Sequence, residues 1–310
     1  MKILDRLRNQ QRGSVLVITA AMLVVLVGLT ALVVDLGLLY ATRVQLTNVA
    51  DAAALAGVQE LPRNSDGAYS SAAEYARLNG KAGDRVDIRV LSGTTVAVKA
   101  TRTVSLMFAQ IFGLATCDVS GAAAARINPV SRLTGTLPFG LVQQTLVYGQ
   151  VYTIKIGSGT ASGSYHGNFG ALALGGTGAS VFRDNIKYGT DVSIQIGDWV
   201  TTETGNMVGP TKQGISYRYN QDPTATFATV SKDSSRILVV PVIQSLDVSG
   251  RGAVLVVGFA ALFLESPNLT NNGEVTGRFI QMVAPGDPGS DGGGDYGLYA
   301  SRLISYTSVN

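Results

Sequence analysis

The first strong pattern along the chain is an uninterrupted apolar run near its N-terminus. Residues 15–34 read VLVITAAMLVVLVGLTALVV and contain no charged residue. A helix of this length rises about 30 Å, which matches the hydrocarbon thickness of a bilayer. The pattern therefore predicts a transmembrane helix over residues 13–35. Its anchoring side chains are Val15, Leu16, Ile18, Leu23, Leu26, Leu29, Leu32 and Val34.

The helical pattern continues beyond the apolar run. Residues 35–61 contain no internal proline, and apolar residues recur there at spacings of three, four and seven: Leu39, Leu46, Val49, Ala53 and Ala56. Such spacing places one stripe on a helix, so we expect an unbroken helix of about 70 Å from residue 14 to 61. The small side chains of residues 50–57 allow close packing, either on the chain's own domain or on neighbouring subunits of a filament.

The region after this helix shows mixed periodicity. Residues 68–79 are typical of a second helix, and residues 85–91 and 95–104 alternate as two strands with Gly93 in the turn between them. A short amphipathic helix over 105–113, ended by Gly113, and a third strand over 115–126 complete an α–β–β–α–β order. Together with the helix extension 36–61, we expect a small α+β domain over residues 36–127.

The residue composition changes after a predicted linker at residues 128–137. Glycine and threonine become dense, and short strand-like runs alternate with turn signals. The ten runs are 139–148, 150–156, 169–174, 191–196, 198–203, 215–219, 237–244, 252–264, 274–283 and 297–306. Together with a short helix at 180–188, they predict a β-rich, sandwich- or barrel-like domain over 138–310. The apolar stretch 253–264 is too short to span a bilayer and is expected to be a buried strand.

The net charge of +3 comes entirely from the first twelve residues. There, Lys2, Arg6, Arg8 and Arg12 outnumber Asp5, and the rest of the chain is neutral. A basic segment (1–12) before an apolar span predicts a cytoplasmic N-terminus and an exported C-terminal part. A neutral remainder disfavours a nucleic-acid partner. A cleaved signal peptide is the alternative, but its apolar core would be about 7–15 residues long, so we expect a retained anchor.

The composition offers little for catalysis. With one cysteine, Cys117, and one histidine, His166, the chain holds no internal disulfide, zinc finger or Cys-x-x-Cys redox pair. Asp198 and Glu203 are a conceivable carboxylate pair, although turn and surface roles are the expected ones. We therefore predict no catalytic residue and no cofactor.

One acidic segment is a weak candidate for a metal site. In PGDPGSDGGGD (285–295), Asp287, Asp291 and Asp295 lie four residues apart among glycines. Clustered carboxylates bind Ca²⁺, but the segment matches no EF-hand loop and lacks a closing glutamate. A surface loop is the expected role.

Three short motifs carry a resemblance to a known family. They are Arg12-Gly13-Ser14 before the apolar span, Val34-Asp35-Leu36-Gly37 at its end, and Asn48-Val49-Ala50-Asp51-Ala52-Ala53-Ala54-Leu55-Ala56 after it. Residues 11–57 resemble the N-terminal segment of TadG-like proteins of the TadE/TadG family, which serve Tad/Flp pilus assembly. A weaker resemblance continues to about residue 127. Fainter still, residues 167–172 and 202–211 resemble tails of such chains in Gram-positive bacteria.

The resemblance implies a function for the whole chain. It implies a non-enzymatic, membrane-anchored structural or assembly component of a pilus or secretion machine, whose partners are pilin or pseudopilin subunits and Tad-type membrane machinery. It leaves open a homo-oligomer, a place in the filament or at its base, and a periplasm or a Gram-positive wall zone outside.

Two departures from related patterns matter. Related prepilins are cut after a glycine and carry a glutamate five residues on. If Gly13 were that glycine, the fifth residue would be Ile18, so we expect no such cleavage. Larger TadG-like chains carry a DxSxS metal motif, and here its nearest match ends in an arginine, at Asp247–Arg251.

Two other function classes compete with assembly. The first is a membrane-anchored adhesin or envelope-binding module, which would use the same anchor without a pilus machine. The second is an anchored hydrolase acting outside the membrane, which the lone histidine disfavours.

Overall fold

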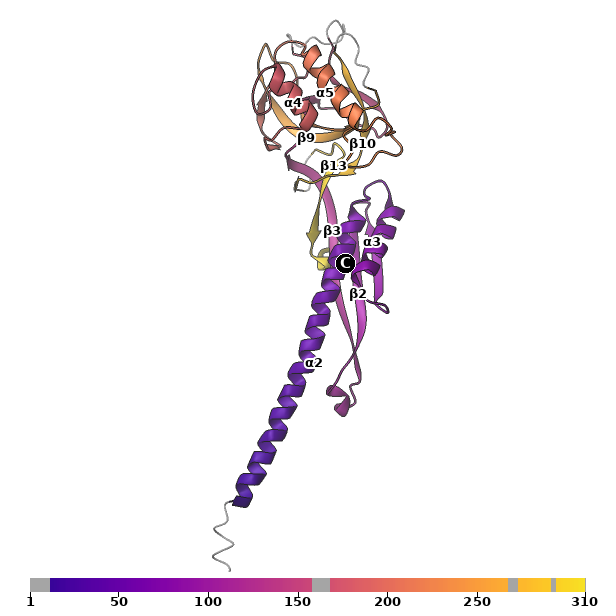
Figure 1. The fold of residues 1–310 in the computed structure, drawn as a ribbon, viewed down its shortest axis with the longest axis vertical. Helices are drawn as coiled ribbons and strands as arrows, with labels where there is room; N and C mark the ends of the chain where they lie inside the picture. The colour runs from indigo at the N-terminus through magenta and orange to yellow at the C-terminus, as the bar shows by residue number, and fades with distance from the viewer. Residues whose placement is uncertain (1–11, 158–167, 267–272, 291–293, 310) are drawn as a thin grey trace, which may run out of the picture.

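The computed structural model describes residues 12–157, 168–266, 273–290 and 294–309. Helix α2 (Arg12–Val58) is continuous over 47 residues and confirms the predicted long helix. Its N-terminal end extends well beyond the rest of the chain (Figure 1), and the side chains of residues 15–34 are exposed except for half-buried Ala31. Among the described residues, this is the one helix that is long and apolar enough to cross a membrane.

The C-terminal half of α2 packs on a sheet that is antiparallel except for the parallel pair β11–β13. Two of its strands form the predicted hairpin, β1 (Arg85–Leu91) and β2 (Thr95–Ser105). Ser92 and Gly93 between them have positive φ angles of 54° and 64°, as a tight type I′ turn requires. The sheet order is β1-β2-β3-β13-β11, and β12 and β6 also pair with β3. The remaining bounds are β3 (Thr116–Leu133), β6 (Ile194–Gln195), β11 (Met282–Val283), β12 (Asp287–Pro288) and β13 (Leu298–Ile304).

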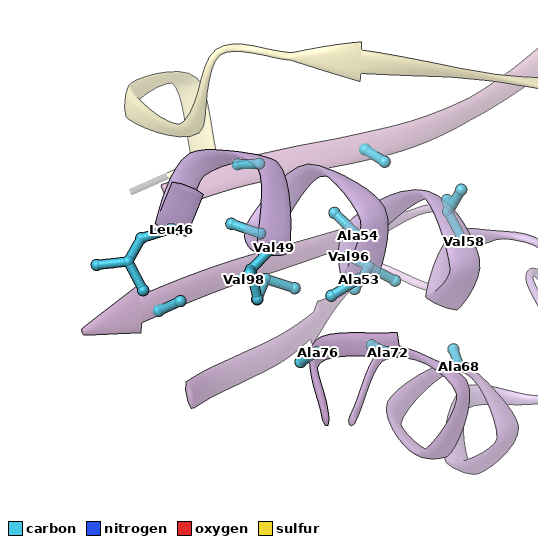
Figure 2. Packing of buried hydrophobic residues seen from close by; sticks show 14 of the residues in the cluster. Leu46, Val49, Ala53, Ala54, Val58, Ala68, Ala72, Ala76, Val96 and Val98 are labelled. Carbon is cyan, nitrogen blue, oxygen red and sulfur yellow. The ribbon is translucent and has the colours of Figure 1, made fainter. Parts of the chain in front are cut away.

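The core of this domain is built from unusually small side chains. Helix α3 (Ser65–Asn79), which Asn64 caps by accepting a hydrogen bond from the Gly67 amide, turns alanines spaced four residues apart toward α2. Figure 2 shows these alanines facing α2 and β2. Methyl side chains let the two helices and the sheet approach closely. The buried residues labelled there are Leu46, Val49, Ala53, Ala54, Val58, Ala68, Ala72, Ala76, Val96 and Val98.

At Gly121, the backbone of β3 lies very close to the backbone of α2. A Cβ atom at this position would clash with the Thr47 amide nitrogen and would lie 2.8 Å from the Thr47 Cα. Because backbone cannot move aside as a side chain does, we expect Gly121→Ala to cost about 3 kcal/mol of unfolding free energy. Chemical denaturation of the full chain in micelles measures this. The matched control is Gly209→Ala on a distant helix, where a Cβ meets nothing within 4 Å; equal losses in the two variants would contradict the close packing.

The second region contains an open six-stranded sheet with two helices on one face. Its order is β4-β8-β9-β10-β5, and β7 pairs with β9. Alternate residues of β8, such as Leu238 and Val240, face α4 and α5, where Phe182, Ile186 and Ile215 cover them. The bounds are β4 (Leu141–Val142), β5 (Val151–Lys155), α4 (Ala179–Tyr188), β7 (Trp199–Thr201), α5 (Val208–Gln221), β8 (Ile237–Ile243), β9 (Ala253–Phe263) and β10 (Val275–Ile280).

Two strands connect the two regions. Strand β3 continues through residues 128–133, the first part of the expected linker, and Val130 and Leu133 enter the core on the other face of the second sheet. Strand β13 lies beside β3 with Tyr299 opposite Pro129, so the C-terminal end of the chain returns to the first sheet (Figure 1). The 3₁₀ helix η2 (Tyr306–Val309) follows it.

The α+β class with a β-rich C-terminal region is confirmed, and β9 fills the stretch expected as a buried strand. The second sheet is not closed into a barrel. The predicted strand 215–219 is wrong, because these residues lie in α5. Five alternating residues fit either period, and burial of Thr211, Gly214 and Ile215 favours a helix. Several other predicted strands shrink to two or three residues within glycine-rich loops.

Candidate functional site: the junction of α2 with a strand hairpin

Asp35 is a buried carboxylate at the end of the apolar run of α2. Its side chain accepts three backbone hydrogen bonds, from the amides of Met107 at 2.9 Å, Phe108 at 3.0 Å and Ala109 at 2.8 Å. These amides lead into the 3₁₀ helix η1 (Ala109–Phe112), and the first amides of a helix have no partner within it. Asp35 therefore caps η1 and fastens the β2–β3 connection to α2.

The β2–β3 connection, residues 106–115, is called the hairpin tip below. The Leu106 amide donates to the Ala115 carbonyl at 2.9 Å and closes its base. Gly113 ends η1 with a left-handed φ of 87°, as predicted. The predicted helix over 105–113 is nevertheless only four residues long, because β2 extends to Ser105 and Asp35 takes the next amides.

The hairpin tip presents large apolar side chains and carries no charge. Phe112 is 85% exposed and Ile111 78% exposed, and Met107, Phe108 and Leu114 are also exposed. Large exposed apolar patches are typical of surfaces that contact another protein, a membrane or a ligand. Charge reappears just above the tip, where the Arg85 guanidinium lies 2.6 Å from the Asp118 carboxylate.

A groove of about 730 Å³ separates the hairpin tip from α2. Its α2 wall extends from Val24 to Leu39, and its other wall includes Leu106, Ile111 and Phe112. The lining is almost wholly apolar; Cys117 lies at its upper end. In Figure 1 the hairpin descends beside α2 and ends next to the exposed half of that helix.

The predicted anchor residues and the predicted packing residues lie in different surroundings. The eight anchor residues, from Val15 to Val34, are all exposed on the free half of α2. Of the packing stripe, Leu46, Val49 and Ala53 are buried in the chain's own first core, while Leu39 and Ala56 are half-buried. The stripe thus packs on its own domain. Arg12 begins α2, and Lys2, Arg6 and Arg8 lie outside the described residues.

The aspartates of 285–295 do not meet at one point among the described residues. Asp287 is exposed, 3.9 Å from the Nε atom of Arg132. Asp295 accepts hydrogen bonds from the Gly297 amide and the Tyr299 hydroxyl. In the described part of the chain, no three His, Cys, Asp or Glu side chains gather as a metal site would need. Asp291 and His166 lie outside that part.

The considered carboxylate pair has structural contacts instead. Glu203 is buried, accepts the Gly178 amide at 2.6 Å in front of α4, and pairs with Arg251 at 2.8 Å. Arg251 is the residue that ends the DxSxS-like stretch. Asp198 accepts the Gln195 amide at 2.9 Å within a turn. Both carboxylates therefore stabilise local backbone.

Sequence patterns did not reveal the buried lysine of β5. The ammonium of Lys155 donates to the Asn206 side-chain oxygen at 2.9 Å and to the Gly273 carbonyl at 3.0 Å. The residue is fully buried, and burial lowers the pKa of Lys155 to about 8. A strand of apolar and hydroxyl residues that ends in one lysine gave no signal for this position.

Lys155 makes stability depend on alkaline pH. Below pH 8 both folded and unfolded states carry the charged lysine. Between its folded pKa of about 8 and its ordinary value of 10.5, the folded state releases the proton while the unfolded state keeps it. The free energy of unfolding should therefore rise by about 3 kcal/mol across this window. Denaturation curves at pH 7 and pH 10 measure the rise, and Lys155→Met should lack it. A rise of equal size in that variant would contradict this assignment.

Comparisons with known proteins bear on one part of the chain. No curated protein sequence and no solved structure matches it. A family model matches a segment that starts just before the apolar span and ends just after α2. The resemblance seen in the sequence is confirmed over this segment. The weaker resemblance up to residue 127 lies outside it. Residues 13–60 match the Tad family model, described as Flp pilus-assembly TadE/G-like, which supports a pilus-assembly role for a chain with a candidate membrane anchor.

Proposed function

We propose that this protein is a non-enzymatic, membrane-anchored structural or assembly component of a Tad/Flp-type pilus or secretion machine. One observation carries the proposal. The family match over residues 13–60 coincides with α2, which is apolar and exposed in its first half and buried in the core of the first domain in its second half. The matched segment thus contains both the anchor and the element on which the domain is built.

The proposed orientation follows from charge. The basic residues of segment 1–12 precede the apolar span, and the remainder of the chain is neutral. Basic residues stay on the cytoplasmic side. The N-terminus would lie in the cytoplasm and both sheets outside, with the anchor retained because Ile18 stands where cleaved pilins carry glutamate.

The proposed mechanism is mechanical rather than chemical. Helix α2 has no break between lipid and core, and its length of about 70 Å makes it a strut. The Asp35 contact adds a second attachment between strut and sheet. An exported domain held in this way keeps a fixed height and direction above the membrane. There it would present the second sheet to pilin or pseudopilin subunits and to the membrane machinery.

Affinity purification from native membranes tests this proposal. The full-length chain, tagged at its C-terminus and cross-linked before solubilisation, should be recovered with pilin subunits and Tad-type machinery. Intact mass should show an uncut N-terminus. A chain shortened by residues 1–13 would overturn the retained anchor. Recovery with envelope material and no pilus component would overturn the assembly role in favour of an adhesin.

A further inference from the structure

We propose that the hairpin tip, residues 106–115, is a second membrane contact. It inserts into the outer leaflet beside α2, and the groove between tip and helix holds lipid acyl chains. The proposal rests on α2 spanning the bilayer with the sheets outside, as proposed above. It goes beyond that function, because contact with lipid requires no pilus partner.

The groove lies deep along the apolar part of α2. The groove follows α2 from Leu39 to Val24, and Val24 lies eleven residues before Asp35, which is about 16 Å of helix. Asp35 ends the apolar run. The greater part of the groove therefore lies at the level of the uncharged span, where the surroundings of α2 are hydrocarbon.

The backbone amides of the hairpin tip are largely paired within the protein. Within a bilayer every backbone amide needs a partner from the protein itself. The Asp35 carboxylate takes the amides of Met107, Phe108 and Ala109. The Leu106 amide donates to Ala115, and inside the tip the amides of Ile111, Gly113 and Leu114 donate to the carbonyls of Phe108, Gln110 and Ala109. These seven amides of the tip therefore have protein partners and need no water.

Apolar and charged side chains are separated along the hairpin. Phe112 and Ile111 are the most exposed large apolar residues of the tip. No charged residue occurs between 103 and 117, and the exposed pair Arg85–Asp118 follows directly above. The apolar tip would lie among the acyl chains, and the charged pair Arg85–Asp118 would lie at the level of the headgroups.

The chemistry of the groove selects its occupant. Its one charged lining residue, Asp35, already uses its carboxylate on three amides. The lining can therefore make van der Waals contacts and leaves no charged group without a partner. Such a lining suits an acyl chain. With α2 and the tip both in the leaflet, the exported domain has two points of support and a fixed tilt.

Fluorescence of a single tryptophan tests the insertion. In the full chain with Trp199→Phe, Phe112→Trp places the only tryptophan at the tip. The protein is reconstituted at low density into phosphatidylcholine vesicles with brominated acyl chains. We expect position 112 to lose most of its emission to these lipids and to resist aqueous iodide. The matched control is Tyr75→Trp in the same background, at an exposed position on α3, which should show the opposite behaviour.

Two outcomes overturn the proposal, and they differ in meaning. If the chain floats with the vesicles and resists carbonate extraction, but position 112 is quenched by iodide as strongly as position 75, the tip is in water and only the insertion fails. If the chain does not integrate at all, the proposed anchor fails with it. Because Phe112 is exposed, its replacement by tryptophan disturbs no core. Ile111→Trp provides an independent second probe.

Discussion

Replacing Ala53 by glutamate is expected to unfold the first domain. Ala53 on α2 is fully buried and faces α3 and β2 (Figure 2). Glutamate extends well beyond the methyl group and brings an unpaired carboxylate into a core of alanine and valine. Overpacking and a buried charge together cost about 4 kcal/mol or more, a large part of the roughly 5–15 kcal/mol that usually stabilises a domain. Urea denaturation in micelles and the protein level in cells measure the loss.

The control for this variant lies on the same helix. Ala41→Glu adds the same side chain at an exposed position, where surface changes cost about 0.5 kcal/mol or less. If Ala53→Glu left stability, protein level and pilus assembly all unchanged, the packing of α2 on its own domain would be wrong.

Replacing Asp35 by asparagine is expected to release the hairpin tip from α2. The carboxylate accepts three amides with two oxygens, whereas asparagine keeps one acceptor oxygen and directs an NH₂ group at the others. Bonds to charged groups are stronger than neutral ones, so the undocked population should rise about tenfold or more. Spin labels at Tyr40→Cys and Gln110→Cys, in a Cys117→Ser background, report the distance between helix and tip.

The expected distance distribution is narrow in the protein that keeps Asp35 and broad in the Asp35→Asn variant. Asp87→Asn is the matched control, at an exposed position on β1, and should leave the distribution narrow. A narrow distribution in the Asp35→Asn protein would mean that apolar contacts alone hold the tip, and that the carboxylate is not what fastens it.

Local pattern was enough to predict the elements with strong periodicity. The apolar run and the stripe through Leu46 and Ala53 fixed one helix, and alternation placed β1 at residues 85–91, as observed. The helix ended by Gly113 was predicted with the correct C-terminal end, but its predicted start at residue 105 was four residues too early. Where an element was short and polar, as at 215–219, the period was ambiguous and tertiary burial decided for a helix.

The candidate site was beyond such reasoning because its parts are distant in the chain. Asp35 and Met107 are separated by 72 positions, and no pattern near either residue announces the other. The return of β13 to β3 and the burial of Lys155 depend likewise on the assembled fold. Strand β3 runs through the first six residues of the expected linker, so no break in secondary structure marks its start. The domain limits proposed from composition remain predictions.

We expect this chain to take part in pilus assembly as a membrane-anchored component. Counting surface filaments by electron microscopy, in native cells lacking the gene for this chain, tests it most directly. We predict that filaments disappear, and that the intact chain restores them while a form without residues 1–35 does not. Normal filament numbers in cells without the chain would contradict the claim.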